Sequence, residues 1–295
     1  MGPNPYLKKL GFANDDKVIV FHADDVGMCH ASVPAFQELY EQGRISSAAT
    51  MVPCAWFPVV ATYCQENPNV DMGVHLTFTS EWDNYRWGPL STRERTSGLL
   101  DEEGYFYRSA EDAQAHAQMD AIEKEVLEQV ATALQAGIDV THVDTHMGTM
   151  LHPKFLPAYV AAGHRYQIPV MALRLTDEQI RGWPPELVAQ ARHVVAELEA
   201  DNFPTFDHFC IMPLREPDNR FEDICQTLES IGPGLTHFVM HPTVDTPEIR
   251  HIAADWQGRV ADYRGFLSEQ LADYLAKSDI QVIGYRDLRD VLRGS

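Results

Sequence analysis

The hydrophobic pattern of the chain alternates between short buried runs and longer amphipathic stretches. The first run, Val18–Phe21, is too short for an amphipathic helix and mostly β-branched, so it predicts a buried strand of a parallel sheet. The stretch Ala31–Glu41 carries apolar side chains at helical spacing and stops at Gly43, which predicts a crossover helix. Alternation of this kind is typical of α/β proteins.

The same alternation continues to the end of the chain. Further strands are expected at Ser46–Val52, Val70–Leu76, Asp139–Met147, Ile168–Leu173, Phe203–Met212, Leu235–Met240 and Ile280–Ile283. Further helices are expected at Trp56–Gln65, Ala110–Ala136, His152–Arg165, Arg220–Ile231, Arg259–Ala276 and Arg286–Leu292. A chain of 295 residues suits one α/β barrel. We therefore predict a single domain over residues 1–295, with seven or eight mostly parallel strands.

The segment 78–107 interrupts this alternation and shows no sustained period. A loop of this length in a compact chain is usually functional or disordered, and its aromatic content argues against disorder. We interpret it as an active-site loop, in which Trp82, Tyr85 and Trp87 are candidates for stacking on sugar rings. The alternative, that these aromatic side chains pack into a small satellite core, stays open.

Polar side chains that can bind a metal or transfer protons lie at or just past the ends of the predicted strands. They are Asp24, Asp25, His75, His142, Asp144, His146, Arg174 and His241. Because the carboxyl ends of parallel strands converge on one mouth of a barrel, we expect one shared site. Gly27 permits the turn that would bring both neighbouring carboxylates to it.

The residue types at these strand ends suit a metal-dependent hydrolase. One carboxylate with two neutral imidazoles is a ligand set for Zn²⁺, Mn²⁺, Fe²⁺, Co²⁺ or, less naturally, Mg²⁺, and it leaves positions open for water. Such an ion lowers the pKa of its water and polarises a carbonyl group, while a carboxylate and a histidine move the protons. The sequence contains no G-x-S-x-G, H-E-x-x-H or G-x-G-x-x-G motif, which argues against serine hydrolases, zincins and dinucleotide-binding proteins.

Charge and cysteine content limit the kinds of partner and of cysteine site that we expect. With 23 basic and 43 acidic residues the formal net charge is −20, which argues against nucleic acid and anionic membranes as partners. Five cysteines without a C-x-x-C pair predict neither a disulfide framework nor a cysteine zinc site. The amino-terminal residues lack the apolar core of a signal peptide and no long apolar span occurs, so we expect a cytoplasmic protein. Whether the protein forms a homo-oligomer stays open.

Four motifs together resemble one known family. They are A-D-D-x-G at Ala23–Gly27, G-x-H-L at Gly73–Leu76, H-x-D-x-H at His142–His146 and M-H-P at Met240–Pro242. Their order and spacing resemble the YdjC-like carbohydrate deacetylases, the group that includes chitooligosaccharide deacetylases. The resemblance implies a distorted (β/α) barrel that removes an acetyl group from N-acetylated sugars with one divalent metal ion.

The resemblance also implies the metal ligands. Asp25, His75 and His146 would bind the ion, with Mg²⁺ or Zn²⁺ foremost and Mn²⁺ or Co²⁺ as alternatives. The substrate would be a small carbohydrate.

The remaining candidates receive supporting roles from the same resemblance. Asp24 would be the general base, and His241 the general acid that protonates the leaving amine. Asp144 and His142 would lie behind the metal ligands, where Asp144 could orient a ligand histidine. Arg174, just past a predicted strand, could fix the carboxylate of Asp24.

Two other functions use similar residues. A metal-dependent phosphoesterase or sugar isomerase would need groups for a phosphate, and no dense Lys/Arg cluster accompanies the site. A non-catalytic carbohydrate-binding protein would lack a base or an acid, and both Asp24 and His241 are present. Both functions stay as alternatives. The function that the resemblance implies, and that we predict, is removal of an acetyl group from an N-acetylated sugar or oligosaccharide by metal-activated water.

Overall fold

A computed structural model describes residues 2–294. The strands are β1 (Lys17–Val26), β2 (Ser47–Thr50), β3 (Met72–Leu76), β4 (Val140–Thr145), β5 (His208–Ile211), β6 (Gly234–Met240) and β7 (Ile280–Val282). The helices are α1 (Pro5–Lys9), α2 (Ser32–Glu41), α3 (Phe57–Glu66), α4 (Ala110–His116), α5 (Met119–Gln135), α6 (Leu156–Tyr166), α7 (Pro185–Ala200), α8 (Arg220–Ser230), α9 (Pro247–Ile252), α10 (Trp256–Leu267), α11 (Glu269–Ala276) and α12 (Tyr285–Arg293). Two short 3₁₀ helices, η1 (Arg95–Ser97) and η2 (His146–Leu151), complete the described elements.

The described strands form one parallel sheet of seven strands. Six follow the order β4-β3-β2-β1-β6-β5, and β7 pairs with the first residues of β1. Strand β1 is the centre of this sheet, because it pairs with β2, β6 and β7 and is buried along nearly its whole length. The predicted single α/β domain with mostly parallel strands is confirmed.

The sheet is not closed by continuous ladders within residues 2–294. The strand predicted at Ile168–Leu173 makes only two isolated bridges, Val143↔Val170 and Leu173↔Phe206. Pro169 lacks the N–H group that a regular ladder needs, which limits pairing at this point. This segment therefore occupies the gap between β4 and β5 without filling it as an eighth strand.

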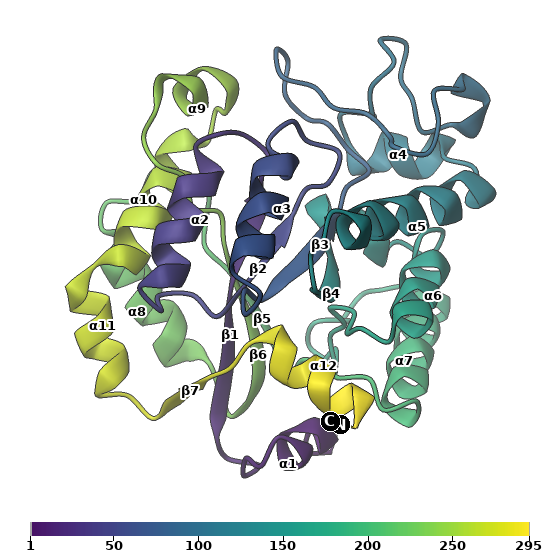
Figure 1. The fold of residues 1–295 in the computed structure, drawn as a ribbon. Coiled ribbons are helices and arrows are strands. Elements are labelled where there is room, and N and C mark those ends of the chain that lie inside the picture. The colour runs from purple at the N-terminus through teal and green to yellow at the C-terminus, as the bar shows by residue number, and fades with distance from the viewer. Residues whose placement is uncertain (1, 295) are drawn as a thin grey trace.

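Helices cover the outside of the sheet. Figure 1 shows α2 and α3 side by side, and α1 next to α12 at the amino ends of the strands. The hydroxyl of Tyr6 in α1 donates to the carbonyl of Leu288 in α12 at 3.2 Å, which holds these terminal helices together. Residues 2–294 contain no helix long and apolar enough to cross a membrane.

Two helices predicted as continuous are broken. The stretch 110–136 forms α4 and α5, because Ala117 and Gln118 adopt extended backbone between them. The stretch 259–276 lies in α10 and α11, and the Ser268 side chain between them accepts a hydrogen bond from Leu271 N–H as the cap of α11. The short helices α1 and α9 were not predicted; each is capped by a polar side chain, Asn4 and Thr246 respectively.

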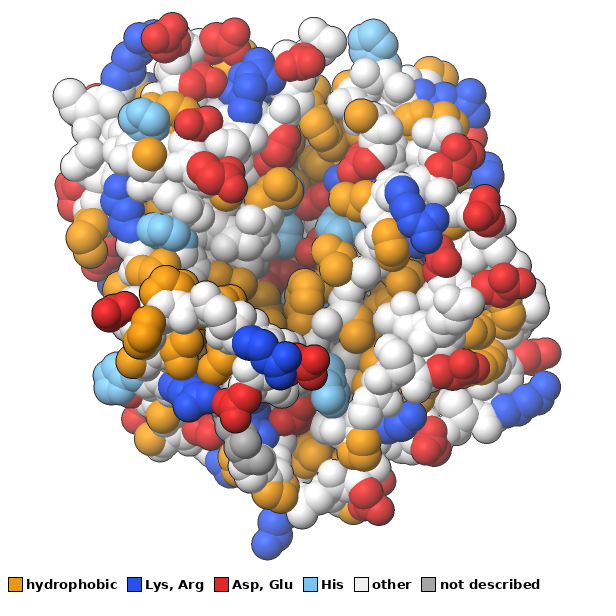
Figure 2. Space-filling view, turned by 180° about the vertical axis from the view of Figure 1, so that it is seen from behind, with side chains coloured by type: hydrophobic (Ala, Val, Ile, Leu, Met, Phe, Trp, Pro, Cys, Tyr) orange, Lys and Arg blue, Asp and Glu red, His pale blue; other side chains and the backbone are white. Residues whose placement is uncertain are grey.

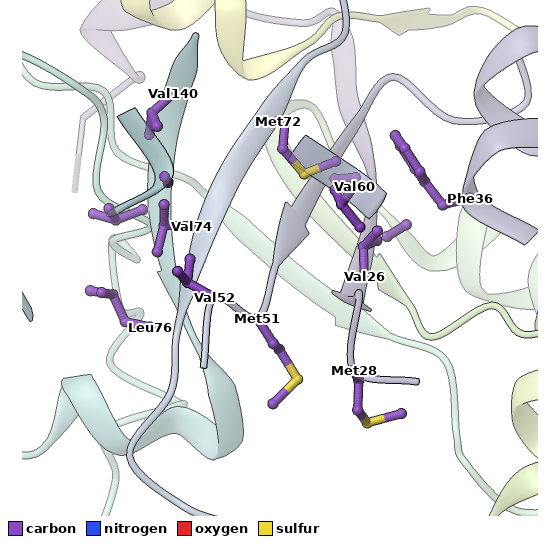
Figure 3. Packing of buried hydrophobic residues seen from close by; sticks show 14 of the residues in the cluster. Val26, Met28, Phe36, Met51, Val52, Val60, Met72, Val74, Leu76 and Val140 are labelled. Atoms are coloured by element: carbon purple, nitrogen blue, oxygen red, sulfur yellow. The ribbon is translucent and has the colours of Figure 1, made fainter. Parts of the chain in front are cut away.

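The hydrophobic core lies between the sheet and its helices. Figure 3 shows Val60 of α3 and Phe36 of α2 beside Val26 of β1 and Met72 of β3, all buried in one cluster. Strands β1, β2, β3, β4 and β6 are buried on both faces, so in this part of the sheet only strand ends and loops are left for a site.

Candidate metal centre and active site

A cavity of about 490 Å³ opens at the carboxyl ends of the strands. Figure 2 shows a hollow in the middle of one face, with hydrophobic side chains along its walls. Seven predicted site residues line the cavity, namely Asp24, Asp25, His75, Trp82, Asp144, His146 and His241. Glu81 and Arg259 line it as well. The expected convergence of these strand ends is therefore observed.

The end of β1 brings two consecutive carboxylates to this cavity. The register of β1 against β2 shifts between Ala23 and Val26, and Asp25 has φ +60°. Left-handed backbone is uncommon for residues other than glycine, and aspartate is one of the residues that tolerate it best. The turn expected at Gly27 (φ +83°) thus already begins at Asp25.

Three residues could hold a metal ion. Asp25 Oδ1 lies 3.4 Å from His75 Nε2 and 3.1 Å from His146 Nδ1. This oxygen is buried and has no hydrogen-bond partner of suitable geometry among the described residues. A buried, unpaired carboxylate oxygen beside two imidazole nitrogens is costly without a cation, so these residues fit a divalent ion.

Acidic partners behind both histidines orient the rings. Asp144 Oδ1 lies 2.8 Å from His75 Nδ1, and Glu81 Oε1 lies 3.0 Å from His146 Nε2. Each contact leaves the other ring nitrogen facing Asp25, as carboxylate partners of metal-binding histidines commonly do. Glu81 was not predicted, because it lies in the irregular loop where only the aromatic residues were considered.

The electrostatics of this group also favour a cation. Burial alone would lower the pKa of both histidines, but Asp144 and Asp24 raise the pKa of His75 well above its usual value. Glu81 and Asp25 likewise raise the pKa of His146, to about 9. Burial would raise the pKa of Asp25, yet His146 and Arg259 lower it well below its usual range. The site therefore stabilises positive charge.

A second group within metal-binding distance lies deeper and is already hydrogen-bonded. It consists of His22, Asp24, Asp144 and His237. His22 Nδ1 lies 2.7 Å from Asp24 Oδ1, and His22 Nε2 lies 2.8 Å from His142 Nε2. Both nitrogens of His22 are thus occupied, and the first group fits a metal better.

Asp24 and His241 face each other beside the candidate metal site. Asp24 Oδ2 lies 3.8 Å from His75 Nε2 and 3.8 Å from His241 Nε2. Burial lowers the pKa of His241, and the nearby Asp25 offsets this only in part, which favours the neutral ring. Its Nδ1 is buried and lacks a hydrogen-bond partner in the described part of the chain.

The predicted contact of Arg174 with Asp24 is wrong. Arg174 does not line this cavity. Its Nε donates to Glu199 Oε1 at 2.8 Å, and its Nη1 donates to Asp207 Oδ1 at 2.7 Å. The prediction assumed a regular strand before Arg174, and the segment runs instead through the gap in the sheet.

Arg259 of α10 is the arginine at the candidate site. Its Nη1 donates to Asp25 Oδ2 at 2.7 Å, while Nε donates to Asp255 Oδ1 at 2.9 Å. The guanidinium also lies 5.7 Å from the ring centre of Trp82. No feature of the sequence singled out this arginine, because it lies within a predicted helix rather than at a strand end.

The three aromatic residues of the loop differ in position. Their rings pack against one another, with centres 5.8–6.2 Å apart. Trp82 lines the cavity, whereas the Tyr85 hydroxyl donates to Met28 O at 2.6 Å and Trp87 is buried. The loop therefore forms both a cavity wall and a small core of its own.

His142 lies behind the cavity and does not line it. Its ring is fully buried and stacks on Tyr285 with centres 3.6 Å apart. Gly73 makes room for it, because a Cβ atom there would lie 2.4 Å from His142 Cε1. Of the two histidines and the aspartate of the H-x-D-x-H motif, Asp144 and His146 line the cavity.

Comparison with known proteins identifies the family of the chain. The model of the YdjC-like protein family matches residues 18–277. A carbohydrate deacetylase of Thermus thermophilus is 29% identical over 97% of this chain and 98% of its own, and one of Thermoanaerobacter pseudethanolicus is 24% identical over 92% and 100%.

A solved structure shows the same fold. It is a candidate cellobiose-phosphate cleavage protein of Enterococcus faecalis, with a TM-score of 0.75, 18% identity, and coverage of 92% of this chain and 99% of that one. The family match spans most of the chain, and the curated relatives are named as deacetylases, which are hydrolases. The chain therefore belongs to the YdjC-like family of carbohydrate deacetylases.

Proposed function

We propose that this protein is a metal-dependent hydrolase that removes an acetyl group from an N-acetylated sugar or oligosaccharide. The observation that supports it most is Asp25 Oδ1, which has no hydrogen-bond partner in the described part of the chain and lies beside two histidine nitrogens, in a cavity that Asp24 and His241 also line. The relatives named carbohydrate deacetylase support the substrate class.

The metal ligands in this proposal are Asp25, His75 and His146. A divalent ion held there would polarise the amide carbonyl and activate water for attack. Zn²⁺ and Mg²⁺ are the first ions to test, followed by Mn²⁺ and Co²⁺. Arg259 holds the second oxygen of Asp25, so that Oδ1 stays directed at the two histidines.

Asp24 and His241 would carry the protons. Asp24 would accept a proton from the attacking water, and His241, whose neutral form burial favours, would gain a proton before it donates one. The 3.8 Å between Asp24 Oδ2 and His241 Nε2 gives that proton a short path to the leaving nitrogen. Water adds to the carbonyl carbon, the C–N bond breaks, and acetate and a free amine leave.

Trp82 would position the sugar. It lines the cavity next to the candidate metal site, and an aromatic face suits the apolar face of a sugar ring. Arg259 supports this ring from one side.

The test is acetate release from N-acetylated mono- and oligosaccharides by metal-stripped protein to which single ions are restored. We expect release that depends on the ion and disappears in Asp24→Asn, whose metal affinity should be unchanged. Full activity of Asp24→Asn with metal bound would contradict the proposed base. Absence of release from every sugar, with metal bound, would contradict the proposed reaction.

A further inference from the structure

A chain of buried hydrogen bonds runs from Asp24 through the interior of the sheet to Asp71, which precedes β3. His22 Nδ1 lies 2.7 Å from Asp24 Oδ1, and His22 Nε2 lies 2.8 Å from His142 Nε2. His142 Nδ1 lies 2.9 Å from Thr141 Oγ1, which lies 2.6 Å from Asp71 Oδ1. All five side chains are buried, so water does not replace any of these contacts.

The number of hydrogens in this chain is constrained. Its four contacts need four hydrogens, and two neutral imidazoles with one threonine hydroxyl supply three. With both carboxylates ionised, one contact would join two acceptors at hydrogen-bond distance, which is unfavourable in a buried site. A fourth hydrogen must therefore lie on a carboxyl group or on a ring.

Asp71 is the place that the surroundings favour. Its Oδ2 accepts the backbone N–H of Arg286 at 2.7 Å, which leaves Oδ1 to face Thr141 and the Ser47 hydroxyl. Burial raises the pKa of Asp71, whereas burial and the neighbouring His22 lower the pKa of His142 well below its usual value. A hydrogen on Asp71 Oδ1 completes the chain with both rings neutral.

We propose that Asp71 ends this chain as a hydrogen donor, and that Thr141, His142 and His22 are positioning residues for the Asp24 carboxylate. Each donor then points toward the cavity: Asp71 to Thr141, Thr141 to His142 Nδ1, His142 Nε2 to His22 Nε2, and His22 Nδ1 to Asp24 Oδ1. The inference rests on the proposed function, in which Asp24 is the base.

The consequence of this order is a defined orientation of Asp24. One oxygen, Oδ1, is held by a donor, and the other, Oδ2, stays directed at His241. The ring of Tyr285 stacks on His142, and Gly73 leaves just the space that the His142 ring fills. These two contacts fix the plane of the His142 ring, so the row of hydrogen bonds cannot easily rearrange. The positioning role belongs to the whole chain and not to His22 alone.

Asp71→Asn tests in which direction the hydrogen bonds between Asp71 and Asp24 are donated. The Arg286 N–H requires the amide oxygen of Asn on its own side, so the amide nitrogen faces Thr141 and donates as the proposed carboxyl group does. We expect Asp71→Asn to keep kcat and the melting temperature close to those of the parent. If Asp71 accepted from Thr141 instead, Asp71→Asn would place the amide N–H against the Thr141 O–H, and both kcat and the melting temperature would fall.

Thr141→Val breaks the chain and serves as the contrast. We expect kcat to fall by about 10-fold to 100-fold, as for other residues that orient a site from behind, with KM little changed. Thr141→Ser keeps the hydroxyl and should restore kcat. Ser47→Ala is the matched control, because Ser47 also contacts Asp71 and lies outside the chain. A loss in Asp71→Asn as large as in Thr141→Val would overturn the proposal.

Nitrogen NMR of the imidazole rings gives a measurement without metal or substrate. We expect His22 as the neutral Nδ1–H form and His142 as the neutral Nε2–H form at pH 7, in the parent and in Asp71→Asn. A protonated imidazolium at either ring would place the fourth hydrogen there and overturn the role of Asp71. These ring forms with no acetate release from any sugar would refute the proposed function and leave the chain intact.

Discussion

Two groups of histidines lie side by side in this protein and differ in what they can bind. The outer group, His75 and His146 with Asp25, includes a buried carboxylate oxygen that lacks a hydrogen-bond partner within residues 2–294. Neighbouring carboxylates raise the pKa of both rings. The inner histidines are His22, His142 and His237, and burial lowers the pKa values of His142 and His237. The same residue type thus serves as a candidate metal ligand in one place and as a neutral hydrogen-bonding link in the other.

The difference follows from the partners of each ring. Each outer histidine has a carboxylate on one nitrogen and faces Asp25 with the other, whereas His22 spends both nitrogens on Asp24 and His142. Metal binding requires a free lone pair that points at a shared centre. Proximity of histidines and carboxylates therefore does not by itself identify a metal site.

The largest expected effect breaks the outer group. We predict that His146→Ala lowers the affinity for a divalent ion by more than about 100-fold, since it removes a ligand and not only an orienting partner. The measurement is calorimetric titration of metal-stripped protein. His237→Gln, in the inner group, is the control and should bind the ion as the parent does. Equal binding by His146→Ala and the parent would show that the ligands are assigned wrongly.

The next effect separates binding from proton transfer. We predict that Asp24→Asn lowers kcat by about 100-fold to 10,000-fold, the usual contribution of a general base, while the ion still binds. Acetate release and metal titration on the same protein check it. Parallel loss of metal affinity would mean that Asp24 belongs to the metal site.

A smaller effect concerns the acidic partner of an outer histidine. Glu81 accepts from His146 Nε2 at 3.0 Å, so Glu81→Gln weakens the orientation of the ring and should lower metal affinity by about 10-fold. Glu103→Gln, in the same loop but paired with Arg86, is the matched control. No difference between these two variants would argue against an orienting role for Glu81.

The last effect concerns stability at acidic pH and not activity, and it comes from the inner histidines. Burial and the neighbouring His22 lower the pKa of His237 to about 3, so the unfolded chain takes up a proton near pH 6.5 before the folded protein does. This contribution to stability is present above pH 6.5 and is lost as the pH falls toward 3. We expect the melting temperature of His237→Gln to fall less steeply over this range than that of the parent. Identical slopes would mean that His237 is already charged in the folded state.

The sequence predicted the part of the site that depends on strand ends. Asp25, His75 and His146 meet because parallel strands place their carboxyl ends at one edge of the sheet. Glu81 and Arg259 come from a loop and a helix, whose positions relative to the site follow from packing and leave no periodic signal.

Two further differences between the predicted and the observed site also follow from packing across the sheet. Arg174 follows a segment that looks like a strand by composition but lies in the gap of the sheet, so it points to Glu199 and Asp207. His22 lies in an apolar run and was passed over, although a polar ring inside a buried strand needs a partner. That partner, His142, lies on β4, and sequence alone does not reveal such a pairing across the sheet.

The exposed side of β5 bears on what the cavity can hold. Phe209 and Ile211, two residues apart on β5, are 37% and 48% exposed and line the cavity together with Trp82. A ligand bound there therefore meets apolar side chains as well as the charged residues at the strand ends, and these walls favour a ligand that has both an apolar face and polar groups.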